Sequence, residues 1–113
     1  MTDSRDEPDD IRFLQEEFRR HLAIFYSRLK LAPPYQSVEK AIAHFTASLK
    51  AMAPDELKRV GTDPDRRWAQ YRTAFVESGL HRKHRGIIAG FARSRQGLDL
   101  PAEYHPFLDA FIS

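Results

Sequence analysis

Arginine and lysine side chains recur late in the chain with no carboxylate nearby to neutralise them. Arg82, Lys83, Arg85 and Arg93 fall within twelve residues, and no Asp or Glu occurs from residue 78 to residue 98. A guanidinium group presents a planar fork of N–H donors that matches phosphate oxygens, and an ammonium group binds the same oxygens as a point charge. Solvent-exposed helices usually mix both signs of charge. This composition therefore indicates a surface for a phosphate-rich partner.

The imbalance extends over the middle of the chain. The net charge of the 113 residues is only +2, but residues 58–95 sum to +7, whereas residues 1–57 sum to −2 and residues 96–113 to −3. Such segregation of charge indicates which kinds of partner the protein can bind, and it says little about the fold. We predict that eight cationic residues contact phosphate groups: Arg66, Arg67, Arg72, Arg82, Lys83, Arg85, Arg93 and Arg95. Such contacts depend on charge and shape rather than on base sequence. The alternative is that these side chains merely solvate an outer helix face.

Other chemistries have weaker support. The chain has no cysteine, which excludes disulfides, thiolate metal sites and cysteine nucleophiles. His81 and His84 have the spacing of a helical metal site, but the neighbouring Arg82, Lys83 and Arg85 oppose a cation. No Gly-rich loop follows a strand, as a nucleotide site would need. We expect no metal, no cofactor and no catalytic residue, and hence a protein that is not an enzyme.

The elements that position these residues are predicted to be helices, because apolar residues recur at steps of three and four along most of the chain. Prolines, glycines and capping residues bound them. The predicted helices run from Asp9 or Asp10 to the Pro33-Pro34 pair, from an N-cap at Ser37 to about 52, over 54–60, from an N-cap at Asp63 to Gly79, from about 81 to 96, and over a short stretch near 107–112. The sequence predicts an all-α fold, a compact bundle of about five to six helices with no sheet, in which 9–113 form one domain after a mobile acidic tail at 1–8.

The basic helix predicted at 81–96 has two faces on a wheel of 100° per residue. Ile87, Ile88 and Phe91 fall on one side, together with Leu80, His84 and Leu98. Arg82, Arg85 and Arg93 fall on the other, with the small residues Gly86 and Ala89 between them. If Ile87 and Phe91 point into the core, the three arginines form one continuous ridge. The two glycines, Gly86 and Gly90, could alternatively permit a close helix–helix crossing.

Aromatic and apolar residues fall into two groups. Trp68, Tyr71, Phe75 and Phe91 have helical spacing and are expected in the core, whereas Tyr35 and Tyr104 are better candidates for exposed contacts. Phe13, Ile24 and Tyr26 lie off the main apolar stripe of the first helix. They predict that this helix has apolar contacts on more than one side; the alternative is an exposed patch, a surface for a protein partner or for self-association.

These features favour a non-catalytic helical subunit that contacts the phosphate backbone of RNA or single-stranded DNA within a larger assembly. In size, helix content and charge the chain resembles the small helical subunits of CRISPR-type effector complexes. A helix-turn-helix regulator is a variant of this hypothesis, because the turn Ser78-Gly79-Leu80 precedes the basic residues.

The alternative is a protein-interaction module, such as an adaptor, immunity protein or antitoxin, that uses the acidic ends or the patch on the first helix. Without a signal peptide or a membrane-spanning run, we expect a cytoplasmic protein that does not bind membranes.

Overall fold

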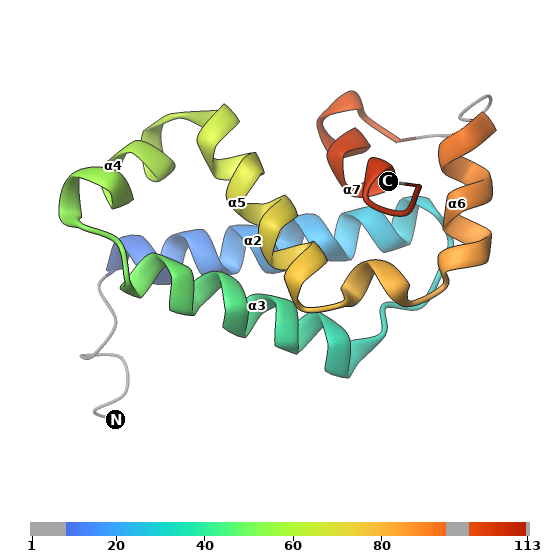
Figure 1. Cartoon of the computed structure of the whole chain (residues 1–113), viewed down its shortest axis with the longest axis horizontal. Helices are drawn as coiled ribbons and strands as arrows, with labels where there is room; N and C mark the ends of the chain where they lie inside the picture. Colours follow the sequence, from blue (N-terminus) through green and yellow to red (C-terminus); the bar gives the residue numbers. More distant parts are fainter. Residues whose placement is uncertain (1–8, 95–99, 113) are drawn as a thin grey trace.

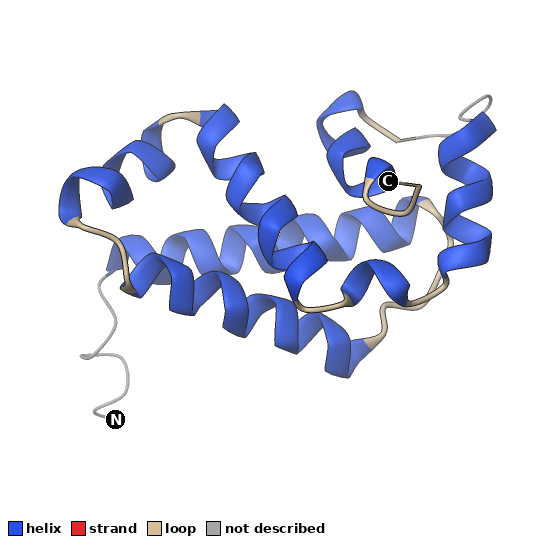
Figure 2. Ribbon diagram, in the orientation of Figure 1, coloured by secondary structure: helices blue, strands red, loops and turns tan. Residues whose placement is uncertain are grey.

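The computed structural model describes residues 9–94 and 100–112, and these residues contain helices and connections but no strand (Figure 2). The prediction of an all-α bundle of five to six helices is confirmed. The predicted tail at 1–8 lies outside the described residues. The elements are α2 (Asp9–Arg28), α3 (Tyr35–Lys50), α4 (Pro54–Thr62), α5 (Pro64–Glu77), the 3-10 turn η1 (Leu80–Arg82), α6 (Arg85–Ser94), the 3-10 turn η2 (Ala102–Tyr104) and α7 (His105–Asp109).

The long helices α2 and α3 lie side by side in opposite directions, and α5 crosses them (Figure 1). The helix α4 and the start of α2 lie at one end of the molecule, whereas η1, α6 and the start of α3 lie toward the other. The helix α7 packs against both α5 and α6. The chain therefore brings η1 beside the first turns of α3, although more than forty residues of sequence separate them.

Capping explains most of the helix boundaries. The side chain of Asp63 accepts a hydrogen bond of 3.0 Å from the backbone N–H of Asp65, and Pro64 occupies the first turn of α5. Gly79, with φ of +84°, ends the same helix in the left-handed conformation that glycine adopts at little cost. The predicted cap at Ser37 is wrong, because α3 begins at Tyr35 with Pro34 as its N-cap. The fixed φ of proline suits the start of a helix, so α3 begins two residues earlier than Ser37.

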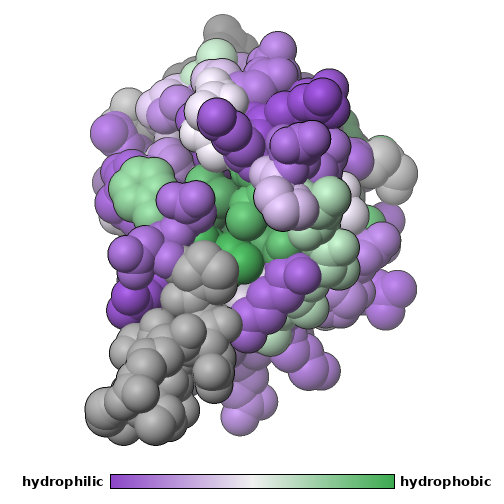
Figure 3. Space-filling view, turned by 90° about the vertical axis from the view of Figure 1, so that its left-hand side faces the viewer, coloured by the Kyte–Doolittle hydropathy of each residue, from purple (hydrophilic) through white to green (hydrophobic). Residues whose placement is uncertain are grey.

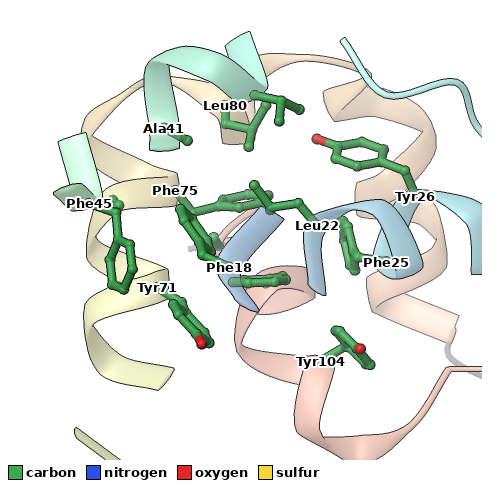
Figure 4. Packing of buried hydrophobic residues seen from close by; sticks show 14 of the residues in the cluster. Phe18, Leu22, Phe25, Tyr26, Ala41, Phe45, Tyr71, Phe75, Leu80 and Tyr104 are labelled. Atoms are coloured by element: carbon green, nitrogen blue, oxygen red, sulfur yellow. The ribbon is translucent and has the colours of Figure 1, made fainter. Parts of the chain in front are cut away.

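Aromatic rings fill the centre of the bundle (Figure 4). The Phe18 ring of α2 lies 4.9 Å from the rings of both Phe45 in α3 and Tyr71 in α5. Phe75 stacks on Phe107 of α7 at 4.8 Å. The predicted core placement is confirmed for the aromatic set: Tyr71 and Phe75 are fully buried, and Trp68 and Phe91 are partly buried against the same cluster.

Two predictions of exposure are wrong. Tyr104 is only 2% exposed, because its hydroxyl lies 3.0 Å from Nδ1 of His21 inside the bundle. The alternative of an exposed patch at Phe13, Ile24 and Tyr26 does not hold: Tyr26 is buried, Ile24 is partly buried, and only Phe13 is largely exposed, at 63%. The second half of α2 is covered on more than one side by the later elements of the chain (Figure 1), which accounts for the burial.

The predicted continuous helix at 81–96 is also wrong. The chain makes one 3-10 turn at η1, becomes extended at Lys83, and adopts a positive φ of 56° at His84 before α6 begins. This break lets Leu80 enter the core and turns α6 so that Ile88, Ala89 and Ala92 are buried. Ile87, expected inside, is 53% exposed, and His84 is exposed as well. Ala89 faces inward rather than outward, and Phe91 is partly buried.

A partly buried histidine of α2, His21, gives the fold a dependence on pH. His21 packs against the rings of Trp68, Tyr71 and Tyr104. Burial lowers its pKa, and the nearby charge of Arg20 adds to the effect. Burial likewise lowers the pKa of His81. The folded chain thus binds fewer protons than the unfolded chain just below the unfolded histidine pKa of about 6.5, so acidification through this range favours unfolding.

We expect the Tm to fall between pH 7.5 and pH 5.5, measured by circular dichroism in buffers of equal ionic strength. The variant His21→Phe keeps an aromatic ring and removes the titrating group, so its Tm should fall less over the same range, with His81 supplying the remaining dependence. Equal pH dependence in the wild type and the variant would show that His21 does not contribute.

Candidate nucleic-acid interface

Three cations from two elements line one hollow on the surface. Lys40 comes from α3, and Arg82 and Lys83 come from η1 and the residue after it. The hollow, called here the α3–η1 groove, has a volume of about 370 Å³. It is lined by Gln36, Ser37, Lys40, Ser78, Gly79, Arg82 and Lys83. No carboxylate lines it among the described residues, so the groove carries a formal charge of three positive units.

Two acidic residues, Glu39 and Glu77, are sequence neighbours of groove residues, but neither of them lines the groove. Glu39, next to Lys40, forms an ion pair with Arg19 of α2. The carboxylate of Glu77, next to Ser78, lies 4.0 Å from Nδ1 of His44. Within the part of the chain that the structure describes, Lys40, Arg82 and Lys83 have no ion-pair partner. Unpaired cations gathered in a concave surface raise the local potential and favour anion binding.

Two further arginines lie close to this groove. The charges of Arg82, Arg85 and Arg72 all act on His81, where they add to the lowering of its pKa by burial. Arg72 comes from α5 and Arg85 from the first turn of α6, so both lie within electrostatic range of the same imidazole as Arg82. Of the predicted contact residues, Arg82 and Lys83 therefore line the groove, and Arg72 and Arg85 lie within electrostatic range of the residue before Arg82.

The other predicted residues do not join this region. Arg66, in the first turn of α5, lies 3.6 Å from a carboxylate oxygen of Glu56 and 3.5 Å from one of Asp63. Arg67 donates a hydrogen bond of 3.0 Å to the carbonyl of Gly61. Arg93 is exposed near the end of α6, roughly 12 Å along the helix from Arg85. Arg95 lies outside the described residues. The predicted single ridge of Arg82, Arg85 and Arg93 is not formed, because the break at Lys83 and His84 places Arg82 on a separate element.

Lys40 was missing from the sequence-based set. It lies in the acid-containing first half of the chain, and only the packing of η1 on α3 brings it to Arg82 and Lys83. One signal was available: Lys40 follows Ser37 by three residues, which places both on one face of a helix near its start. That spacing does not indicate that η1 forms the other side of the groove.

The start of α3 adds polar groups to the groove. No side chain caps this end and no acidic residue occupies its first turn, so its first N–H groups retain the partial positive charge of a helix N-terminus. The hydroxyl of Ser78 is already used, because it donates to the carbonyl of Phe75 at 3.2 Å. Ser37 is therefore the hydroxyl of the groove that remains available as a donor.

No family model, curated protein or solved structure matches this chain. Function therefore has to be inferred from the side chains themselves. Among the described residues, no helix is both long and apolar enough to cross a membrane. The same residues include no group of three or more His, Asp or Glu side chains placed to hold a metal ion.

A second hollow lies at the opposite end, between the start of α2 and α4. It has a volume of about 270 Å³ and is lined by Asp10, Phe13, Leu14, Leu57, Lys58, Gly61 and Thr62. Figure 3 looks at this end of the molecule and shows apolar surface surrounded by hydrophilic residues. Phe13 is the largest exposed side chain there. This hollow, called here the apolar hollow after Phe13, Leu14 and Leu57, also contains polar side chains, and unlike the α3–η1 groove it includes a carboxylate, that of Asp10.

Proposed function

We propose that this protein is a non-catalytic helical subunit that binds the phosphate backbone of a nucleic acid through the α3–η1 groove, without sequence preference. The observation that carries the proposal is the convergence of Lys40, Arg82 and Lys83, from two distant parts of the chain, on one hollow that no carboxylate of the described residues lines. A phosphodiester carries one negative charge and two free oxygens. The Arg82 guanidinium can donate two parallel hydrogen bonds to those oxygens, and the two lysines supply charge.

The groove favours backbone contact over base reading. Its basic side chains are accompanied by small residues, Ser37, Ser78 and Gly79, which leave room for a phosphate to approach the protein backbone. Arg72 and Arg85 act electrostatically on His81, the residue before Arg82, and so add positive potential on this side of the molecule. Phosphate contacts position a nucleic acid without distinguishing its sequence.

Because the groove can contact only a few phosphates, we propose that the protein works as a subunit of a larger assembly. Binding that depends on three to five cations is weak on its own, on the order of 10⁻⁴–10⁻⁶ M at physiological salt. Joining several such surfaces in one particle raises the overall affinity without new contacts. The small size and the helical fold agree with such a subunit role.

The test is a titration of fluorescently labelled oligonucleotides by anisotropy over a salt series. We expect micromolar binding at 50 mM salt that weakens as salt rises, with a slope of log K against log salt of roughly −2 to −3.5, since each phosphate contact on a single strand contributes about −0.7. Oligonucleotides of different sequence should bind alike. Absence of binding at low salt, by a chain whose circular dichroism spectrum shows it is folded, would rule the proposal out.

Protein binding through the apolar hollow is the second candidate, and the exposed Phe13 beside Leu57 favours it. An exposed ring next to an apolar hollow is typical of a helix-docking surface. The two candidates make different predictions. Capture of a protein partner that resists nuclease and is lost in Phe13→Ser would support the second candidate, whereas nuclease sensitivity would support the first.

A further inference from the structure

We infer that the nucleic acid bound by this protein is single-stranded, with one phosphate in the α3–η1 groove and an adjacent base stacked on Tyr35. The inference rests on the proposed function and adds to it the class of nucleic acid and the side chain that selects it. Tyr35 is 74% exposed, the most exposed of the large apolar side chains in the part of the chain that the structure describes.

The geometry places this ring next to the phosphate-binding residues. Tyr35 lines a hollow of about 280 Å³ together with Pro34, Gln36, Ser37 and Lys83. Three of these residues, Gln36, Ser37 and Lys83, also line the α3–η1 groove. The two hollows therefore meet, and Lys83 lies at their junction. A strand that seats a phosphate between Lys40 and Lys83 passes directly beside the Tyr35 ring.

The position of Tyr35 in the chain fixes its backbone. It is the first residue of α3 and follows Pro34, whose φ of −75° is fixed by its ring. The loop before it contains a second proline, Pro33. The backbone that carries the ring is therefore ordered before a base stacks on it, and stacking has to order only the side-chain torsions of the tyrosine.

The chemistry distinguishes single strands from duplexes. In a duplex both faces of each base are covered by neighbouring bases, so an aromatic side chain on the protein surface has no free face to contact. In a single strand a base can turn outward and stack on an aromatic ring, and every base offers a π-face, so such stacking needs no defined sequence. Cations beside an exposed aromatic ring are the usual combination in single-strand binding proteins.

The other exposed apolar residues do not offer this arrangement. Among the described residues the remaining large exposed ones are Phe13, Ile87 and Ile112. Phe13 is the aromatic one, and it lines the apolar hollow at the opposite end of the molecule. It provides a matched control, because it is an exposed aromatic residue of similar size whose hollow holds a single cation, Lys58, together with the carboxylate of Asp10.

The experiment measures the anisotropy of labelled 12-nucleotide oligo(dT), oligo(U) and a matched DNA duplex at 50 mM salt, with the full chain. Tyr35→Ala should weaken binding of the single strands roughly tenfold, within the five- to hundredfold range known for loss of one stacked base. Tyr35→Phe keeps the ring and should bind like the wild type. Phe13→Ala should also bind like the wild type, and none of the three variants should alter the weaker duplex binding.

Three outcomes separate the inference from the proposed function. Loss of single-strand binding in Tyr35→Ala for either oligo(dT) or oligo(U) supports the inference, and the difference between the two reports the combined effect of the 2′-hydroxyl and the thymine methyl group. Equal binding of duplex and single strand, with Tyr35→Ala unchanged, overturns the inference but leaves backbone binding by the groove in place. Absence of binding to every oligonucleotide overturns both.

Discussion

Reversing two charges of the α3–η1 groove, in Arg82→Glu/Lys83→Glu, is expected to lower the affinity for single-stranded oligonucleotides by a hundredfold or more. Each charge-assisted hydrogen bond to a phosphate contributes about 1.5–3 kcal/mol, and about 1.4 kcal/mol corresponds to a factor of ten in affinity. The variant loses two such contacts and gains two charges that repel the phosphate. Both side chains are exposed, so the fold should persist. Anisotropy titration at 50 mM salt provides the measurement.

The matched control reverses two arginines at the other end of the molecule, in Arg59→Glu/Arg66→Glu. These arginines are also exposed, but they lie near the carboxylates of Glu56 and Asp63. The control changes the net charge by the same amount. It replaces surface ion pairs, which stabilise a fold by about 0–1 kcal/mol each, with like-charge contacts of similarly small effect. Equal loss of binding in both variants would show that net charge, and not the groove, determines affinity.

A milder variant tests Lys40, the residue that sequence reasoning omitted. Lys40→Gln removes one charge without adding another. If its ammonium contacts a phosphate, the slope of log K against log salt should become shallower by about 0.7. An unchanged slope would remove Lys40 from the interface and leave Arg82 and Lys83 as its cations.

Truncation of the central ring, Phe18→Ala, is expected to have the largest effect on stability. Phe18 is fully buried and contacts Phe45 of α3, Tyr71 of α5 and Phe107 of α7, so one side chain connects four helices (Figure 4). Replacing a buried Phe by Ala costs about 3–5 kcal/mol, a large fraction of the 5–15 kcal/mol that stabilises a typical domain. Urea denaturation followed by circular dichroism should show the midpoint shift to much lower urea, or no folded baseline.

The comparison variant is again Phe13→Ala. Phe13 belongs to the same helix and the same residue type, but it is largely exposed, so its truncation should change the free energy of unfolding by no more than about 1 kcal/mol. Similar destabilisation by both variants would contradict the packing described here, because burial is the main difference between the two positions.

Much of the fold follows from local sequence. Steps of three and four in the apolar pattern predict α2 and α3, and the pair Asp63-Pro64 predicts the start of α5, because the cap and the fixed φ are properties of adjacent residues. The break before α6 could not be predicted in this way. Neither Lys83 nor His84 is a glycine or proline, and the positive φ of His84 is adopted because burying Leu80, Ile88 and Ala92 together requires the chain to turn there.

The candidate site shows the same limit. The acid-free segment identifies Arg82, Lys83 and Arg85 from composition alone. Whether a given arginine is free depends on its neighbours in space: Arg66 lies beside the carboxylates of Glu56 and Asp63. Lys40 belongs to the groove only because η1 packs on α3. A single sequence specifies which face a residue occupies on its own helix, but not which other helix that face meets.

The two glycines of α6 determine how this helix behaves once the protein is folded. No heavy atom of the described residues lies within 4 Å of a Cβ built at Gly86 or Gly90, so neither glycine is required for a close crossing there. Each weakens the helix by about 1 kcal/mol relative to alanine, and a helix of ten residues is marginal without tertiary support. The amide hydrogens of α6 should therefore exchange with deuterium before those of α2 and α3. We expect α6 to open while the aromatic centre stays closed, and this opening would let Arg85 and Arg93 change position without unfolding the rest of the described residues.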